Sequence, residues 1–166
     1  MDPQGNGSSR EQGAPGAVAE LLMAGTELAQ VLERLIRRRA DIGLVQFNAL
    51  RVLGAREPEA AQPSDLTRAL RMSSAHATTV LQQLAQRGLV ERSSSPSDRR
   101  RRLVRLTAAG RAALAEALPA VALLEDRLIV ALGSAEASSA LWSQLRRVRL
   151  VMREALAADD LDCVGP

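Results

Sequence analysis

Residues 63–107 read PSDLTRALRMSSAHATTVLQQLAQRGLVERSSSPSDRRRRLVRLT, and this stretch contains the most informative pattern in the chain. Its first part predicts a short helix that begins at Pro63, because proline suits the first turn of a helix. A three-residue turn, 71–73, comes next, and apolar residues then recur at helical spacing between positions 77 and 84. Gly88 is typical of the end of a helix. The pattern therefore predicts two helices joined by a short turn.

Two strand-like runs follow the second of these helices. They are residues 89–92 and 103–106, and the polar segment 93–102 between them contains four consecutive arginines. Two such runs predict a hairpin, although ten residues make a long hairpin loop. A helix-turn-helix followed by a basic hairpin is typical of a winged helix-turn-helix, in which the second helix enters the major groove of DNA.

The positive charge of the chain is concentrated in the same stretch. The whole chain carries a net charge of +3 from 22 basic and 19 acidic residues, and every basic residue is arginine. Residues 63–107 hold nine arginines and three acidic residues, so the net charge of this stretch is +6. The net charge of the rest of the chain is therefore −3. A basic segment in an otherwise acidic protein is the pattern expected of phosphate binding.

Helical periodicity continues on both sides of the stretch. The first predicted helix ends at the arginines 37–39 and carries a stripe of leucines at positions 21, 28, 32 and 35. A second helix is predicted to stop near Gly54. Thr107 is a suitable N-cap for a fifth helix, and Ser134 for a sixth. The sixth carries the apolar stripe Leu141, Leu145, Val148 and Met152.

The fold class that these patterns predict is mainly α, with about six helices and a two-stranded wing. Residues 1–16 are rich in Gly, Ser, Pro and Gln, and we expect them and residues 159–166 to be disordered tails. Between the tails we expect a first helix at 17–40, a winged helix-turn-helix domain at 41–107, and further helices at 108–158.

The segment 98–107 resembles the wing signature of the MarR family of winged helix-turn-helix transcriptional regulators. That signature in its commonest form is D-x-R-x-x-L-x-x-L-T, and its positions are occupied here by Asp98, Arg100, Leu103, Leu106 and Thr107. The match in spacing extends upstream through Leu84 and residues 88–92. The resemblance covers residues 18–156 and includes the order of the helices around the wing.

The resemblance implies roles for the wing and for the terminal helices. It implies that Arg100 inserts into the minor groove, where a narrow groove concentrates negative potential, and that Asp98 holds the wing tip by pairing with a nearby arginine. Arg99, Arg101 and Arg102 are assigned to phosphates or to solvent. It also implies a dimerisation domain built from helices 17–40 and 108–158 of two copies. The alternative is that their apolar stripes pack on the core of a single chain.

Short polar side chains lie at the start of the second helix of the helix-turn-helix: Ser73, Ser74, His76, Thr78 and Thr79. We predict that this group contacts base edges, while backbone N–H groups at the helix start meet phosphate. The alternative is that the serines only cap the helix and the threonines face water.

Other classes of function find little support. His76 and Cys163 are the single histidine and cysteine, so no nucleophile with its base, and no cluster of metal ligands, can be assembled. We therefore expect no enzyme, no metal and no cofactor. The first helix lacks the cysteine of peroxide-sensing relatives. The chain has no signal sequence and no apolar run of the roughly 20 residues that a membrane span needs, so we expect a cytoplasmic protein without a membrane partner.

These expectations combine into a repressor that binds double-stranded DNA as a homodimer at a pseudo-palindromic operator. Many members of the MarR family bind small phenolic or aromatic acids, and Arg37, Arg38, Arg39 or Arg51 could pair with such an anion. The identity of the effector stays open. The alternatives are an architectural DNA-binding protein that responds to no ligand, and a dimeric interaction module whose basic wing contacts an acidic protein.

Overall fold

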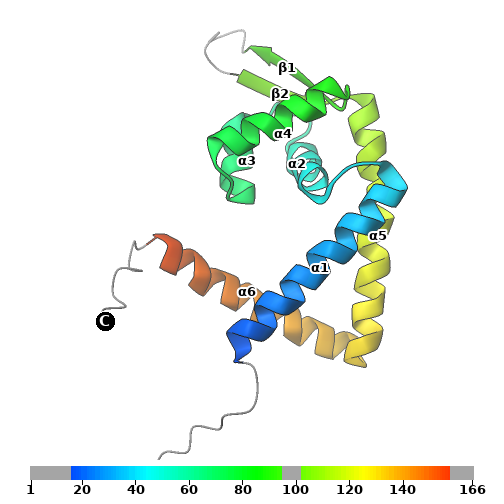
Figure 1. The fold of residues 1–166 in the computed structure, drawn as a ribbon, viewed down its shortest axis with the longest axis vertical. Helices are drawn as coiled ribbons and strands as arrows, with labels where there is room; N and C mark the ends of the chain where they lie inside the picture. Colours follow the sequence, from blue (N-terminus) through cyan, green and yellow to red (C-terminus); the bar gives the residue numbers. More distant parts are fainter. Residues whose placement is uncertain (1–15, 95–101, 158–166) are drawn as a thin grey trace, which may run out of the picture. The chain divides into compact units, whose positions relative to one another are not determined.

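The computed structural model describes residues 16–94 and 102–157. They form six helices and two strands (Figure 1). The elements are α1 (Ala17–Ala40), α2 (Leu44–Gly54), α3 (Pro63–Leu70), α4 (Ser74–Gln86), β1 (Val90–Ser94), β2 (Arg102–Leu106), α5 (Ala108–Leu132) and α6 (Ala135–Ala157). The predicted class, mainly α with a two-stranded wing, is confirmed. Apart from Gly16, the two predicted tails lie outside the described residues.

The contacts within the chain divide it into two units. The first unit ends at Ala117 and contains α1 to α4, both strands and the first part of α5, whereas the second unit begins at Leu118 and contains the rest of α5 together with α6. The predicted domain boundaries describe roles in DNA binding and dimerisation, and they stay predictions.

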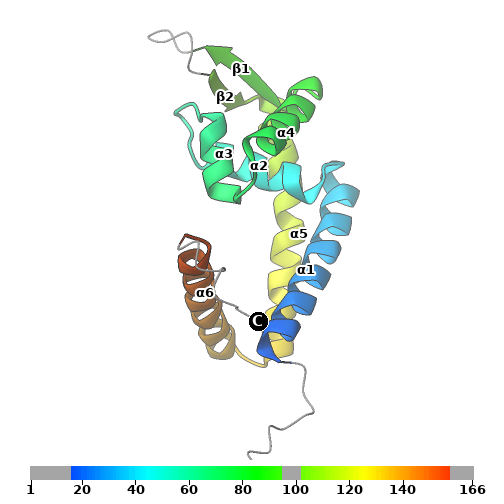
Figure 2. The same ribbon diagram turned by 60° about the vertical axis from the view of Figure 1, so that its left-hand side comes forward.

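The core of the first unit forms where α2, α3 and α4 pack on one another (Figure 2). Leu50 of α2, Leu66 of α3 and Leu81 of α4 are each fully buried there. Full burial of one such side chain contributes about 1.5–3 kcal/mol to stability. The turn between α3 and α4 passes through Arg71, whose φ of 50° is left-handed, so that α3 ends and α4 starts in a new direction.

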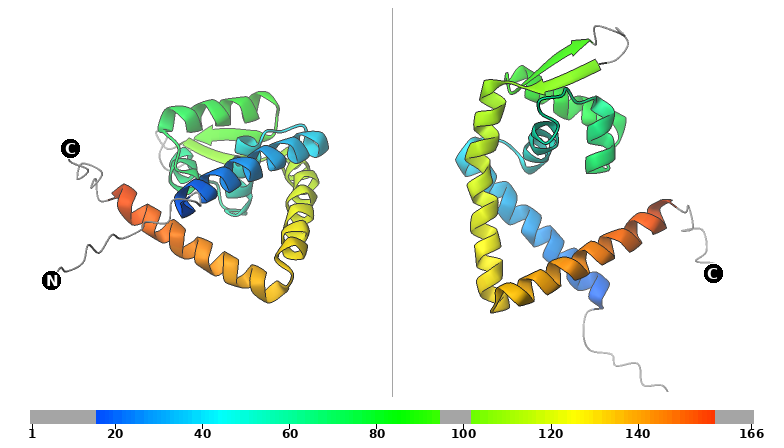
Figure 3. Two further views of the ribbon diagram at one scale, coloured as in Figure 1. Left: turned by 60° about the horizontal axis from the view of Figure 1, so that its bottom comes forward. Right: turned by 180° about the vertical axis from the view of Figure 1, so that it is seen from behind.

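The wing is an antiparallel pair of strands in which Val90 lies opposite Leu106 and Ser94 lies opposite Arg102. Figure 3 shows both strands and the entry of the chain into α5 directly after β2. Val90, Val104 and Leu106 are buried against the helices. Val104 also exchanges two backbone hydrogen bonds with Ala61, of 2.8 and 3.0 Å, which join the loop before α3 to the wing.

The predicted extent of the hairpin loop was too long. Pairing continues to Ser94 and Arg102, so the segment between the strands is 95–101 instead of 93–102. The two serines of β1 are exposed and polar, and they lack the apolar alternation by which a strand is detected in a sequence. Their backbone hydrogen bonds to β2 make them strand residues regardless of the side chain.

Thr107 joins the end of α4, the wing and the start of α5. Its hydroxyl group donates a hydrogen bond of 2.7 Å to the carbonyl of Gly88 and accepts one of 3.0 Å from the N–H of Gly110. The second bond is the predicted N-cap of the fifth helix. Gly110 lies against the backbone of Leu89, and a Cβ atom built on Gly110 would come within 1.9 Å of the Leu89 carbonyl oxygen.

The second unit consists of long helix segments. α5 continues through Pro119 to Leu132, and the Ser134 hydroxyl then accepts a hydrogen bond of 3.1 Å from the N–H of Ala137, as predicted for an N-cap. Hydrogen bonds from its own backbone N–H and from Ser134 lower the pKa of the exposed Glu136 below its ordinary value. None of the described helices is both long enough and apolar enough to cross a membrane.

The contact of Gly110 with Leu89 leads to a first prediction. Gly110→Ala should lower the free energy of unfolding by about 1–3 kcal/mol, because the new methyl group has to displace backbone. This loss should appear although alanine favours a helix over glycine by about 1 kcal/mol. Denaturant unfolding at fixed protein concentration measures the difference. Ala112→Ser, on the exposed side of the same helix, is the control and should change stability by less than about 0.5 kcal/mol. A Gly110→Ala protein as stable as the original would contradict the close approach.

Candidate nucleic-acid interface

α4 presents a polar face to solvent because its other face is buried. Its inward positions are Ala77, Val80, Leu81 and Leu84, which are between 0 and 3% exposed. Of the predicted base-contacting residues, Ser74, His76, Thr78 and Thr79 are exposed members of α4, and Ser73 is exposed as its N-cap. The structure therefore brings all five predicted side chains to the start of one helix.

The hydroxyl groups at this helix start differ in what they can still bind. Ser73 accepts a hydrogen bond of 3.2 Å from the N–H of His76, which is the capping role considered as the alternative. Thr78 and Thr79 donate to the carbonyls of Ser74 and Ala75, at 2.8 and 3.1 Å. Their protons are thus in use, while their oxygen lone pairs and methyl groups stay available for base amino groups and for the methyl group of thymine.

Residues in the middle of the exposed face were not among those predicted to contact DNA. Ala75, Gln82 and Gln86 lie there between the predicted residues, and all three are exposed. Glutamine can bond adenine through two hydrogen bonds, so Gln82 and Gln86 are candidates for base recognition. The signal was present in the sequence, since the buried spacing 77, 80, 81 and 84 places these positions on the opposite side of a helix.

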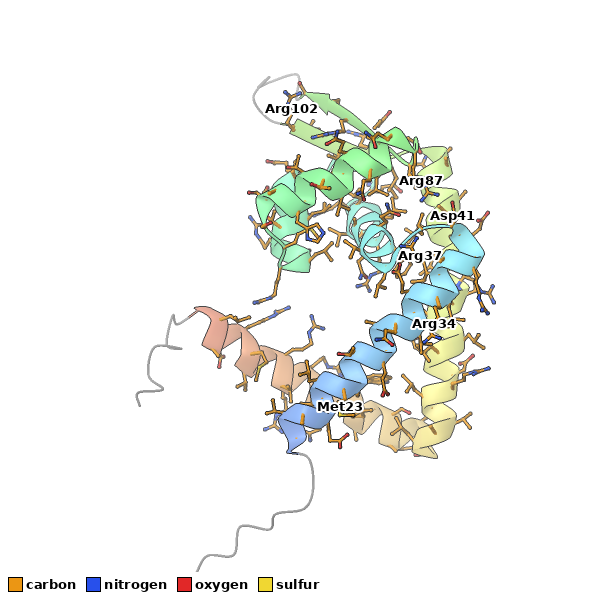
Figure 4. The ribbon with its side chains drawn as sticks, viewed as in Figure 1. Met23, Arg34, Arg37, Asp41, Arg87 and Arg102 are labelled. Atoms are coloured by element: carbon orange, nitrogen blue, oxygen red, sulfur yellow. The ribbon has the colours of Figure 1, made fainter. Side chains whose placement is uncertain are left out.

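The predicted wing residues fall into two groups. Arg102 is the first residue of β2, where it is exposed and lies opposite Ser94 (Figure 4). Asp98, Arg99, Arg100 and Arg101 lie outside the described residues, so their roles stay predictions. Farther down the wing, Arg105 donates a hydrogen bond of 3.3 Å to the carbonyl of Pro58 and so helps to hold the loop before α3.

Several described arginines around α4 are not neutralised by described carboxylates. Arg68, Arg71, Arg92 and Arg102 are exposed, and within the described ranges none of them has a carboxylate oxygen within 4.0 Å. Asp65, the acid of α3, is engaged by Arg56 at 2.8 Å and accepts a hydrogen bond from the N–H of Gln62. The surface around the exposed face of α4 therefore carries net positive charge, as phosphate binding requires.

Arg87 connects the end of α4 to the end of α1, a role that sequence analysis did not assign (Figure 4). Its guanidinium group donates to the Asp41 carboxylate at 2.9 Å and to the Asp41 carbonyl at 2.7 Å. Asp41 adopts a left-handed φ of 52° as the C-cap of α1, which turns its carbonyl toward α4. The Asp41 side chain is 91% exposed, so the ion pair itself contributes only about 0.2–1 kcal/mol.

A small hollow of about 170 Å³ lies between α1, the start of α2 and α4. It is lined by Glu33, Arg37, Gly43, Leu44, Val45, Gln46, His76, Val80 and Gln83. Glu33 accepts hydrogen bonds from the guanidinium group of Arg37 and from the N–H of Leu44, which ties α1 to α2 at its wall. Of the arginines considered as effector ligands, Arg37 lines the hollow, whereas Arg38, Arg39 and Arg51 are exposed and are not among its walls.

Comparison with known sequences gives matches to part of the chain. Residues 40–101 match the model of the MarR family. The transcriptional repressor MprA of Escherichia coli (strain K12) is 41% identical over 73 residues, which are 44% of this chain and 42% of MprA. The aligned segment thus spans less than half of the length of that relative.

Comparison with solved structures extends the similarity to most of the chain. A probable transcriptional regulator from Pseudomonas aeruginosa is 32% identical with a TM-score of 0.67, and the match covers 79% of this chain and 95% of that protein. The transcriptional repressor CouR, solved bound to a 23-mer DNA duplex, is 30% identical with a TM-score of 0.73, and the match covers 80% of this chain and 92% of CouR.

The N-cap of α4 can be tested by substitution. Ser73→Ala should lower the free energy of unfolding by about 1 kcal/mol, because the N–H of His76 loses its acceptor. Ser73→Asp should restore most of that loss, since a carboxylate also caps a helix. Thermal or denaturant unfolding measures both variants. The neighbouring Ser74→Ala is the control and should stay within about 0.5 kcal/mol of the original protein. Equal losses from the two alanine variants would argue against a capping role of Ser73.

Proposed function

This chain belongs to the MarR family, and from that premise we propose that it is a transcriptional repressor that binds a pseudo-palindromic operator as a homodimer. The observation that carries the proposal is the exposed polar face of α4 beside arginines that have no described carboxylate partner. A helix of this kind fits the width of the major groove. The DNA duplex bound to CouR supports the same partner for this chain.

In the proposed complex, α4 reads sequence and the wing adds affinity. Ser74, Thr78 and Gln82 face base edges, while the wing extends to the adjacent minor groove, where Arg100 lies. A second copy places its own α4 one helical turn away, at about 34 Å, which explains why the operator is expected to be pseudo-palindromic. Arginine contacts with phosphates release counterions, so the affinity falls as the salt concentration rises.

Exposed apolar side chains support the homodimer. In the first unit Leu22 and Met23 of α1 are 70 and 55% exposed, and in the second unit Val130 and Leu156 are 80 and 62% exposed. Apolar surface of this extent on a water-soluble protein is typical of a surface that binds another protein. Within their own units these side chains lack the burial that a single-chain core would give them, which supports the dimer over the alternative that they pack on one chain.

The hollow beside α4 supports regulation by a small ligand. At about 170 Å³ it is smaller than the ~300–1,000 Å³ of sites for drug-sized ligands, so we infer a compact effector, such as an aromatic acid of one ring. His76 lines the hollow and also lies in the first turn of α4. A ligand there releases the operator only if it binds more tightly to an arrangement of α1 and α4 that does not fit DNA.

Binding to DNA tests the main proposal. Fluorescence anisotropy should detect tight binding to a duplex from the protein's own promoter, weaker binding to a scrambled duplex, and a loss of affinity as salt is added. Arg100→Ala should weaken binding to the promoter duplex by about 1–2 kcal/mol, roughly tenfold. Gln82→Ala should reduce discrimination at one base pair by about 1–3 kcal/mol, measured with single-base variants of the same duplex.

Arg147→Ala, on the exposed surface of α6, is the matched control for loss of one arginine and should leave DNA affinity unchanged. Equal and weak binding to the promoter and scrambled duplexes would contradict a sequence-specific regulator. If the protein then bound an acidic protein through the wing, it would be the interaction module considered as an alternative.

The effector proposal has its own test. Benzoate, as a one-ring aromatic acid, should raise the dissociation constant of the protein–DNA complex by at least about threefold at millimolar concentration. Arg37→Gln should reduce that response, because it removes the guanidinium group that would bind the benzoate carboxylate in exchange for Glu33. Arg38→Gln removes an arginine outside the hollow and is the control. Binding that stays unchanged for benzoate and for other one-ring acids would favour the architectural protein that responds to no ligand.

A further inference from the structure

One side of α6 carries three arginines around an exposed leucine. Arg146, Arg149 and Arg153 follow one another at helical spacings of three and four residues and, with Leu150, line a hollow of about 320 Å³. We call these three residues the arginine face. Leu150 is 54% exposed, so the face combines positive charge with accessible apolar surface.

The arginine face has no described anionic partner within its own unit. No carboxylate oxygen of the described part of the second unit lies within 4.0 Å of these three guanidinium groups. Three like charges on neighbouring turns of one helix repel one another and destabilise the helix unless an anion is near. Negative charge from another source relieves this repulsion.

The first turns of α1 carry the complementary charge. Glu20 and Glu27 lie on one side of α1, and in the described part of the first unit neither has an arginine nitrogen within 4.0 Å. They are separated by seven residues, as are Arg146 and Arg153. At 1.5 Å per residue both separations are about 10.5 Å, so two ion pairs can form at once between one α6 and one α1.

We propose that the arginine face of α6 binds the acidic side of α1, Glu20 and Glu27, of a second copy of this chain. The inference rests on the homodimer proposed above, and it names the charged contacts by which one copy selects the other. Because a two-fold axis makes the interface self-complementary, each copy contributes one arginine face and one acidic side. In a coiled coil, charged residues beside the apolar stripe select the partner helix. The charged residues of α6 and α1 lie beside apolar residues in the same way.

A second copy fits this surface better than a small anion. The apolar side chains next to the charges are also accessible, with Met152 of α6 53% exposed and Leu21 of α1 41% exposed. An anion neutralises guanidinium groups but leaves such side chains in water, whereas a helix with an acidic edge and an apolar stripe covers both.

Charge reversal tests the proposal on the full chain. Arg146→Glu/Arg153→Glu and Glu20→Arg/Glu27→Arg should each raise the dissociation constant of the homodimer by roughly tenfold or more, measured by sedimentation equilibrium, because each places like charges together. An equimolar mixture of the two variants should form a heterodimer as tight as the original dimer, since both of its interfaces are again complementary. Native mass spectrometry identifies the heterodimer by its mass.

The controls separate this inference from the homodimer itself. Arg92→Glu/Arg147→Glu makes the same change in net charge away from the arginine face, and it should leave the dimer unchanged. The neutral variant Arg146→Gln/Arg153→Gln tests the face without repulsion, and its dimer should respond less to salt.

A monomeric original protein would contradict the homodimer. If both charge-reversal variants still formed a tight dimer, the homodimer would stand. Only the proposed contact of the arginine face with Glu20 and Glu27 would then be overturned. Weak association in the mixture would also overturn it, because charge pairs within one chain cannot be restored by mixing.

Discussion

Burial of one side of α4 against α2 and α3 is the constraint on which the rest of the interface depends. Leu81 and Leu84 are fully buried, and each such side chain contributes about 1.5–3 kcal/mol. Because a helix repeats every 3.6 residues, burying these positions leaves the opposite side in solvent. That side holds the short polar residues and the glutamines, so the packing that stabilises the first unit also decides which side chains are available to DNA.

The junction at Thr107 places the wing next to this helix. Its hydroxyl group binds the carbonyl of Gly88 at the end of α4 and the N–H of Gly110 in the first turn of α5. Gly110 lets the first turn of α5 lie close to Leu89, because it has no Cβ atom to meet the Leu89 carbonyl. The wing therefore starts from a backbone position that is held on both sides, and Arg102 stands at the described end of β2.

Two sets of contacts connect α4, the helix proposed to face DNA, with α1. Arg87 binds Asp41 at one end of α4, and the hollow that contains Arg37 and His76 lies toward the other. Both involve exposed or half-exposed side chains, whose interactions are weak enough to rearrange. α1 also carries the acidic side assigned to the second copy. The proposed dimer surface and the proposed ligand site thus share the same helix.

The order of the helices and several of their ends could be predicted from the sequence, because apolar spacing, the capping residues Thr107 and Ser134, and Gly88 are local signals. The sequence also identified the polar start of α4. The pairing of Ser94 with Arg102 and the bond of Arg87 to Asp41, 46 positions away in the chain, became visible only in the tertiary structure. The physical reason is that these features arise from backbone pairing and from contacts between distant segments, which leave no periodic pattern in the sequence.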